Sequence, residues 1–227
     1  MEMRAYFTVG VSAAFLLVQS LIAAEPVSTS EPRTIGKPIQ VFNKKNLKGW
    51  NYHSDDAMTP MGKVWSVKDG VLRCTGQPVG YIFTECQDYE NYVLNVEWRW
   101  PGDGGNSGVF IHYSNKPGAG PRALEVQLAS EVAGDFWGSD ETTIDIEDEA
   151  TRKLGQRYVN LTDGSEKPLG RWNAMKIICR DDEVTVMING DLVNHGAHST
   201  EQKGGIALQS EGAPIEFRKV ELQKLAD

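Results

Sequence analysis

The stretch Ala-Leu-Glu-Val-Gln-Leu-Ala at residues 123–129 alternates aliphatic and polar side chains with a period of two. Successive side chains of an extended strand point to opposite faces, so its large aliphatic residues are predicted to face a core. Glu125 and Gln127 then share the opposite face. A merely solvated face needs no particular polar residues, whereas a binding or catalytic face needs a carboxylate and an amide held side by side.

Short strand patterns fill the chain from residue 39 onward. The clearest is a hairpin in which residues 64–67 and 71–74 flank the favoured two-residue turn Asp69-Gly70. No segment has a long helical period, and the best short helix candidate is 148–154. Many short strands with regular turns predict an all-β domain, a sandwich or jelly roll. Further strands are predicted at 91–100, 107–113, 172–179, 183–188, 191–193, 205–209 and 215–222.

The first 24 residues have the layout of a secretory signal peptide. Arg4 precedes an uncharged run that ends with the small residues Ala23-Ala24. An uncleaved membrane anchor is the alternative, because the run is nearly long enough to span a bilayer. Residues 25–38, rich in Pro, Ser, Thr and Glu, are predicted to be a disordered lead-in, which leaves 39–227 as one domain. We expect an exported protein, periplasmic or extracellular, that leaves the membrane once its signal is cleaved.

The formal net charge of −8, without a basic stripe, argues against nucleic acid and anionic membranes as partners. Cys74, Cys86 and Cys179 lack metal-site spacing, so a Cys74–Cys86 disulfide and three free thiols both remain open. The acidic run at 140–149 lacks the pattern of a calcium loop. We predict no metal and no cofactor, and the sequence does not indicate an oligomeric state.

Four motifs follow one another along the chain. They are Asn106-Ser107-Gly108-Val109-Phe110, Leu124-Glu125-Val126-Gln127-Leu128, Trp172-Asn173 leading to Ile188-Asn189-Gly190, and Ile206-Ala207-Leu208-Gln209-Ser210-Glu211-Gly212 with Ile215-Glu216-Phe217-Arg218. In this order they resemble the 3-keto-disaccharide hydrolase family, over about residues 39–225. The resemblance implies a concanavalin-like jelly roll of two antiparallel sheets with a concave polar face, and export. It also implies action on small glycosides whose sugar is oxidised to a ketone at C3.

The weakly patterned region 133–170 is expected to decorate one face of the domain.

The strand predicted at 123–129 lacks the second catalytic carboxylate of an ordinary glycosidase site. Retaining glycosidases on jelly rolls place carboxylates at i, i+2 and i+4, and these positions are Glu125, Gln127 and Ala129 here. A double displacement needs two carboxyl groups about 5 Å apart, so this strand cannot support it alone. A 3-keto sugar needs less, because the C3 carbonyl acidifies the C2 proton and a single base can start elimination of the C1 substituent.

We predict that Glu125 or His112 is this base, and that Arg218, Asn106 or Gln127 donates hydrogen bonds to the C3 oxygen. Each catalytic candidate has a structural alternative. His112 is also a plausible polar group at a sheet edge, and Glu125 could instead form a salt bridge with Arg99 or Arg218.

The remaining predicted binding residues come from strand phase and composition. Gln209 and Arg218 lie on the last two strands, at positions that recur in the family pattern. Glu97 and Arg99 share one face of their strand and are candidates both for substrate binding and for pairing with neighbouring strands. Trp137, in the decorated region, is predicted to cover a sugar ring. Four other tryptophans are expected in the core, at 65, 98, 100 and 172, and the place of Trp50 is left open.

Two other functions remain open. A non-catalytic carbohydrate-binding module could use the same face for recognition, since fold alone does not specify function. A classical hydrolase of unoxidised glycans would need a second carboxylate, for which Glu97 and Glu211 are the candidates.

Overall fold

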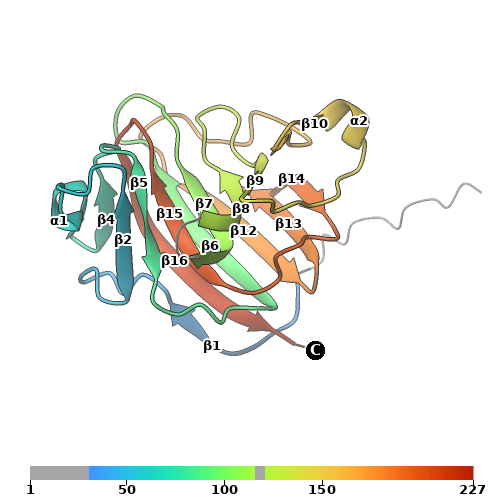
Figure 1. Cartoon of the computed structure of the whole chain (residues 1–227), viewed down its shortest axis with the longest axis horizontal. Helices are drawn as coiled ribbons and strands as arrows, with labels where there is room; N and C mark the ends of the chain where they lie inside the picture. The colour runs from blue at the N-terminus through green and yellow to red at the C-terminus, as the bar shows by residue number, and fades with distance from the viewer. Residues whose placement is uncertain (1–30, 116–120, 227) are drawn as a thin grey trace, which may run out of the picture.

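The computed structural model describes residues 31–115 and 121–226 as two antiparallel sheets packed face to face (Figure 1). The predicted signal peptide lies outside the described residues. Figure 1 shows α1 (Met61–Val64) at one end of the molecule and α2 (Glu149–Arg152) with β10 (Lys153–Leu154) at the other. The architecture is the predicted jelly-roll sandwich.

Sheet A carries, in spatial order, β14 (Asp191–Gly196), β13 (Glu183–Ile188), β12 (Asn173–Arg180), β6 (Tyr92–Arg99), β16 (Ile215–Leu225), β4 (Val71–Cys74) and β3 (Trp65–Lys68), and β1 (Thr34–Gln40) pairs with β16. Sheet B carries β10, β11 (Arg157–Tyr158), β9 (Phe136–Ser139), β8 (Pro121–Gln127), β7 (Gly108–Asn115), β15 (Gly205–Ser210), β5 (Gly80–Thr84) and β2 (Trp50–Ser54). Strands far apart in the sequence therefore lie side by side.

The core lies between the sheets and follows the period-two pattern. On β6 the buried residues Leu94, Val96 and Trp98 face inward, and on β8 Leu124 and Val126 meet them from the other sheet. Each of these side chains is fully buried. The burial of this apolar surface is the main force that holds the two sheets together. The core tryptophans are Trp50, Trp65, Trp98 and Trp100.

Two predicted hairpin turns are confirmed. Asp69 and Gly70 between β3 and β4 have φ of 54° and 76°, and Asn189 and Gly190 between β13 and β14 have φ of 53° and 102°. Positive φ at both central residues matches the twist of antiparallel strands, which is why Asp-Gly and Asn-Gly suit these places. The helix expected at 148–154 is the single turn α2, which passes directly into β10.

Three sequence-based expectations differ from the structure. The lead-in was expected to end at residue 38, but β1 begins at Thr34 and pairs with β16 up to Gln40. The alternative Cys74–Cys86 disulfide is wrong, since both thiols are free and Cys86 is exposed. Trp172 is partly exposed on the outside of sheet A instead of packing in the core. Within the described ranges, every helix is too short to cross a bilayer.

Candidate active site

The strand register of sheet B assembles one row of side chains on the face that points away from the core, here called the site face. Residues directly opposite one another in an antiparallel ladder share a face. Glu125 on β8 therefore has Phe110 of β7 on one side and Trp137 of β9 on the other. The full row is Phe83, Ala207, Phe110, Glu125, Trp137 and Arg157.

A second row runs beside the first. His53 pairs with Tyr81, Tyr81 with Gln209, and Gly108 with Gln127. The His53 ring stacks on Tyr81 with centroids 4.9 Å apart. These two rows bring the predicted residues Glu125, Gln127, Trp137 and Gln209 onto one face. An apolar cluster separate from the core backs them, and it consists of Tyr81, Phe110, Tyr113, Ala123 and Ala207, with Phe83 packed against it.

The Glu125 carboxyl is held over Gly108. A Cβ atom added at Gly108 would lie 2.1 Å from Glu125 Oε1, so only glycine leaves room for the carboxyl group. Glu125 is 8% exposed. Burial, and secondarily the charge of Glu211, raise the pKa of Glu125 to about 8, and no hydrogen bond from a described residue opposes this shift. The carboxyl is therefore protonated in most molecules at neutral pH.

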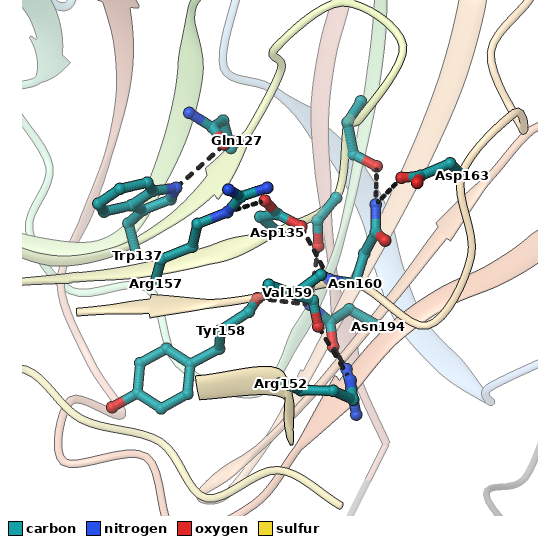
Figure 2. A network of polar contacts seen from close by, with 12 residues as sticks. Gln127, Asp135, Trp137, Arg152, Arg157, Tyr158, Val159, Asn160, Asp163 and Asn194 are labelled. Carbon is teal, nitrogen blue, oxygen red and sulfur yellow. Dashed lines mark hydrogen bonds and ion pairs between the residues drawn. The ribbon is translucent and has the colours of Figure 1, made fainter. Parts of the chain in front are cut away.

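A chain of hydrogen bonds runs from Trp137 through Gln127 to Asn106. The Trp137 indole Nε1–H donates to Gln127 Oε1 at 3.0 Å, as Figure 2 shows. Gln127 Nε2 in turn donates to Asn106 Oδ1 at 3.2 Å. An indole nitrogen can only donate, so it sets the orientation of the Gln127 amide and, through it, that of Asn106. The Asn106 NH₂ group is thereby left as a hydrogen-bond donor at the site.

Arg157 lies on the site face and was not among the site residues predicted from the sequence. Its Nε donates at 2.6 Å to Asp135, which is fully buried and also accepts the Asn160 backbone N–H at 2.7 Å. Figure 2 shows the Arg157 side chain running beside Trp137 with its guanidinium near Gln127 and Asp135. The two terminal NH₂ groups are left as donors. Arg157 lies on a two-residue strand, too short for any period-two pattern to reveal.

Glu97, Arg99 and Arg218 do not join Glu125, because they lie on the outer face of sheet A. Arg218 pairs with Glu97, and Arg99 Nε donates to Glu216 at 2.7 Å. The Arg99 and Arg218 guanidinium carbons lie 4.6 and 4.7 Å from the Trp172 ring centroid. This cation–π and ion-pair cluster explains why Trp172 is outside the core. It also excludes the predicted salt bridges from Glu125 to these arginines.

His112 is also separated from Glu125. The β7–β8 register shifts between Ile111 and Ser114, and His112 has φ of 51°. This bulge places Tyr113 in the site-face cluster and sets His112 against Tyr92 of sheet A, with ring centroids 5.5 Å apart. His112 Nδ1–H donates to the Glu201 carbonyl at 2.9 Å, and burial lowers the pKa of His112 to about 4. The structural alternative for His112 fits this geometry better than the role of base.

The site face combines a protonatable carboxyl, oriented amide and guanidinium donors, and aromatic surface. Such a mixture suits a neutral polyol whose ring also has an apolar face. Across the described residues, no three His, Cys, Asp or Glu side chains are grouped to hold a metal ion.

Comparison with known proteins identifies the family. The model of the 3-keto-alpha-glucoside-1,2-lyase-like domain matches residues 37–223. The chain belongs to this family. Membership of the 3-keto-alpha-glucoside-1,2-lyase-like family confirms the resemblance predicted from the four motifs.

Solved structures share the fold of this family member. A proposed glycosyl hydrolase from Parabacteroides distasonis ATCC 8503 is 23% identical with a TM-score of 0.61, over 84% of this chain and 100% of that one. A carbohydrate-binding module from Bacillus subtilis is 12% identical with a TM-score of 0.55, over 79% and 98% of the two chains. The Pseudoalteromonas carrageenovora kappa-carrageenase, in complex with a carrageenan oligosaccharide, is 12% identical with a TM-score of 0.58, over 83% and 93%.

No curated protein matches the chain significantly. At these identities the solved structures establish the jelly-roll fold alone. Together with the family, they indicate a glycosyl hydrolase or a carbohydrate-binding jelly roll.

The buried Glu125 carboxyl predicts an unusual pH dependence of stability. Its pKa is raised to about 8 in the folded protein, from an ordinary value of 4.5. The folded state therefore holds a proton that the unfolded state releases, and the free energy of unfolding falls as pH rises from about 4.5 to 8. Each pKa unit corresponds to about 1.4 kcal/mol, so the expected fall is a few kcal/mol.

Urea unfolding at several pH values measures this effect. The Glu125→Gln variant is expected to lose this part of the pH dependence, whereas the exposed control Glu85→Gln keeps it. An unchanged pH profile in Glu125→Gln would show that the carboxyl is ionised at little cost.

Proposed function

We propose that the protein cleaves glycosides whose sugar carries a ketone at C3, with Glu125 as the general base. The observation that carries the proposal is the buried Glu125 carboxyl, which accepts no hydrogen bond from a described residue and shares the site face with the donors Asn106 and Arg157. Burial raises the pKa of Glu125 to about 8. A general base is most effective when its pKa lies near the working pH.

The reaction needs only one base. Glu125 takes the proton from C2, and the electron pair of that bond forms an enolate whose negative charge lies on the C3 oxygen. The enolate then restores the C3 carbonyl, forms a C1–C2 double bond and expels the C1 substituent, whose oxygen takes a proton from solvent. Water adds to C1 and a proton returns to C2, so the net reaction is hydrolysis of the glycosidic bond.

Donors for the C3 oxyanion are the NH₂ group of Asn106 and the terminal NH₂ groups of Arg157. Preorganised donors aimed at a developing charge are commonly the largest contribution to catalysis. The Trp137–Gln127–Asn106 chain fixes the Asn106 amide, and buried Asp135 fixes Arg157. Arg157 thus takes the role predicted for Arg218.

Trp137 and Gln209 complete the proposed sugar site. Trp137 is half-buried beside Glu125 and offers a ring surface for the apolar face of the sugar. Gln209 Oε1 is buried and has no hydrogen-bond partner within the described residues. A buried acceptor of this kind is usually satisfied by water or by a ligand, here a sugar hydroxyl.

Two rival functions fit the site face less well. A pure binding module is expected to display open aromatic platforms, whereas Phe110, Tyr113 and Tyr81 are 3%, 0% and 8% exposed. A classical hydrolase needs a second carboxylate, and Glu97 is on the wrong sheet. Glu211 pairs with Asn106 in an isolated backbone β-bridge, and its charge raises the pKa of Glu125. Of the two candidates for a second carboxylate, Glu211 is therefore the one near the site. Export, proposed from the leader pattern, would place the reaction outside the cytoplasm.

Release of the leaving group from a 3-keto-glucoside and from its unoxidised parent tests the proposed function. Wild-type protein is expected to cleave the keto compound only, because the parent has no acidic C2 proton. Glu125→Gln is expected to lose at least a hundredfold in kcat, which is within the range for loss of a general base. Cleavage of the parent would favour the classical hydrolase, and binding without cleavage would favour the binding module.

The Gly108→Ala substitution tests whether the position of the carboxyl matters apart from its identity. The added Cβ would displace the Glu125 carboxyl, so kcat for the keto compound is expected to fall at least tenfold although Glu125 is retained. Gly62→Ala is the matched control, because a Cβ there has open space around it. Equal rates for the two variants would contradict this assignment.

A further inference from the structure

A groove of about 420 Å³, here called the sheet A groove, lies on the outer face of sheet A, on the side of the sandwich opposite the site face. It lies over β6 and β16, between the turn that joins β3 to β4 and the residue that precedes β12. None of its residues belongs to the site proposed above. Its lining includes Lys44, Glu97, Arg99, Trp172, Arg218 and Lys219.

One tryptophan ring holds two guanidinium groups at this groove. The Arg99 and Arg218 guanidinium carbons lie 4.6 and 4.7 Å from the centroid of the partly exposed Trp172 ring. Because like charges repel, the ring and the nearby carboxylates are needed to keep both cations in place. Arg99 Nε and Nη2 contact Glu216 at 2.7 and 2.6 Å, and Arg218 Nε pairs with Glu97. The remaining terminal nitrogens, Nη1 of Arg99 and both Nη atoms of Arg218, have no hydrogen-bond acceptor among residues 31–115 and 121–226.

The ion pairs leave one positive charge in excess. Buried Glu216 contacts both Arg73 and Arg99, so one carboxylate serves two guanidiniums. Lys44 is exposed and forms no ion pair with a described residue. A groove with excess positive charge is unexpected on a chain with a formal net charge of −8. In the lining and the ion-pair network that it belongs to, the cations are Lys44, Arg73, Arg99, Arg218 and Lys219, and the carboxylates are Asp69, Glu97, Glu216 and Glu221.

Lys44 is held in a conformation that lysine rarely adopts. Its φ is 61°, in the left-handed region that favours glycine and asparagine. The Asn43 side chain fixes this turn, because its Oδ1 accepts the backbone N–H groups of Lys45 at 2.8 Å and of Asn46 at 2.9 Å. Backbone geometry therefore does not account for a lysine at this place, whereas a cation that contacts a ligand does.

The groove suits an acidic sugar that carries a single negative charge. A guanidinium presents parallel N–H groups that match a carboxylate or a sulfate group, and one such group balances the excess positive charge. Asp69 and Glu97 can accept hydrogen bonds from hydroxyl groups, but they repel a partner with several negative charges, such as an acidic peptide. The volume of about 420 Å³ lies within the range of small-ligand sites.

We infer that the sheet A groove binds an acidic sugar residue through a carboxylate or a sulfate ester. The inference goes beyond the proposed function and does not depend on it, because the groove and the site face are on different sheets. A glycan bound here leaves the site face open. The groove would thus hold the protein on an acidic glycan while the opposite side of the sandwich remains free to react.

Calorimetry with methyl glucuronide, glucose 6-sulfate and neutral methyl glucoside, at about 0.15 M salt, tests the inference. Lys44→Gly removes the cation and relieves the backbone, so this variant is expected to be at least as stable as wild type. Lys45→Gly is the matched control, because Lys45 is the neighbouring exposed lysine and is not part of the lining. We expect at least tenfold weaker binding of the anionic sugars in Lys44→Gly, as for loss of a hydrogen bond to a charged group, and no change in Lys45→Gly.

Arg218→Lys separates recognition by a guanidinium from attraction to any positive charge. Lysine keeps the charge but lacks the planar pair of N–H groups, so we again expect at least tenfold weaker binding of the anionic sugars. Binding of methyl glucoside is expected to be the same in every variant. The kcat and KM for a 3-keto-glucoside are expected to stay at the wild-type values in both Lys44→Gly and Arg218→Lys, because neither residue is on the site face.

Each other result of the calorimetry decides for or against the groove. Binding of only one anionic sugar supports the inference and identifies the group as a carboxylate or a sulfate. No binding of either by wild type, equal losses in Lys44→Gly and Lys45→Gly, or equally strong binding of free acetate and inorganic sulfate would overturn it. Tighter binding of a glutamate-rich peptide than of either sugar would assign the groove to a protein partner and also overturn it. Cleavage of the keto compound, measured separately, decides the proposed function.

Discussion

The site depends on a carboxyl group that is buried without a cation beside it. Burying an ionised carboxylate in that position costs free energy of desolvation, so the pKa of Glu125 is raised. The surrounding residues follow from this constraint. Gly108 leaves room for the group, and the apolar rings of the site face keep water away from it. The Arg157 cation, already paired with Asp135, does not lower the pKa of Glu125.

Each face of sheet B carries an apolar cluster, and these two clusters link the fold to the site. Its inner face packs on sheet A through residues such as Leu124 and Val126, while its outer face carries a second cluster that includes Tyr81 and Phe110. The decorated region then covers the end of this outer face. Asp135 and Asn194 tie it down, because Asp135 accepts from the Asn160 backbone N–H, and Asn194 Nδ2 donates to Gly134 O at 2.9 Å. Trp137 and Arg157 are held rigidly for this reason.

Much of the fold followed from local patterns in the sequence. Alternation correctly put Glu125 and Gln127 on the face opposite the core, and Asp-Gly and Asn-Gly marked two turns. Alternation predicts the side of the strand on which a residue lies, but it does not predict which sheet the strand joins. Glu97, Arg99 and Arg218 were therefore assigned to the right kind of face on the wrong sheet.

Other features have no local signal. His112 follows the alternation of β7 until a bulge reverses its side, and bulges depend on the partner strand. Arg157 lies on a strand of two residues and gains its role only by pairing with Trp137 across β9. The groove lined by Trp100, Ser130 and Leu169 arises where three distant segments meet. Such long-range placement comes from tertiary contacts, which a single sequence read locally does not contain.

The central claim is that the C2 proton of the sugar is removed during cleavage. Running the reaction of a 3-keto-glucoside in D₂O and analysing the released 3-keto sugar tests this claim, with product incubated with Glu125→Gln to measure background exchange. The account predicts one deuterium at C2 in every product molecule, because that proton is lost to the base and regained from solvent. Product that keeps its original hydrogen at C2 would contradict elimination and point to direct displacement at C1.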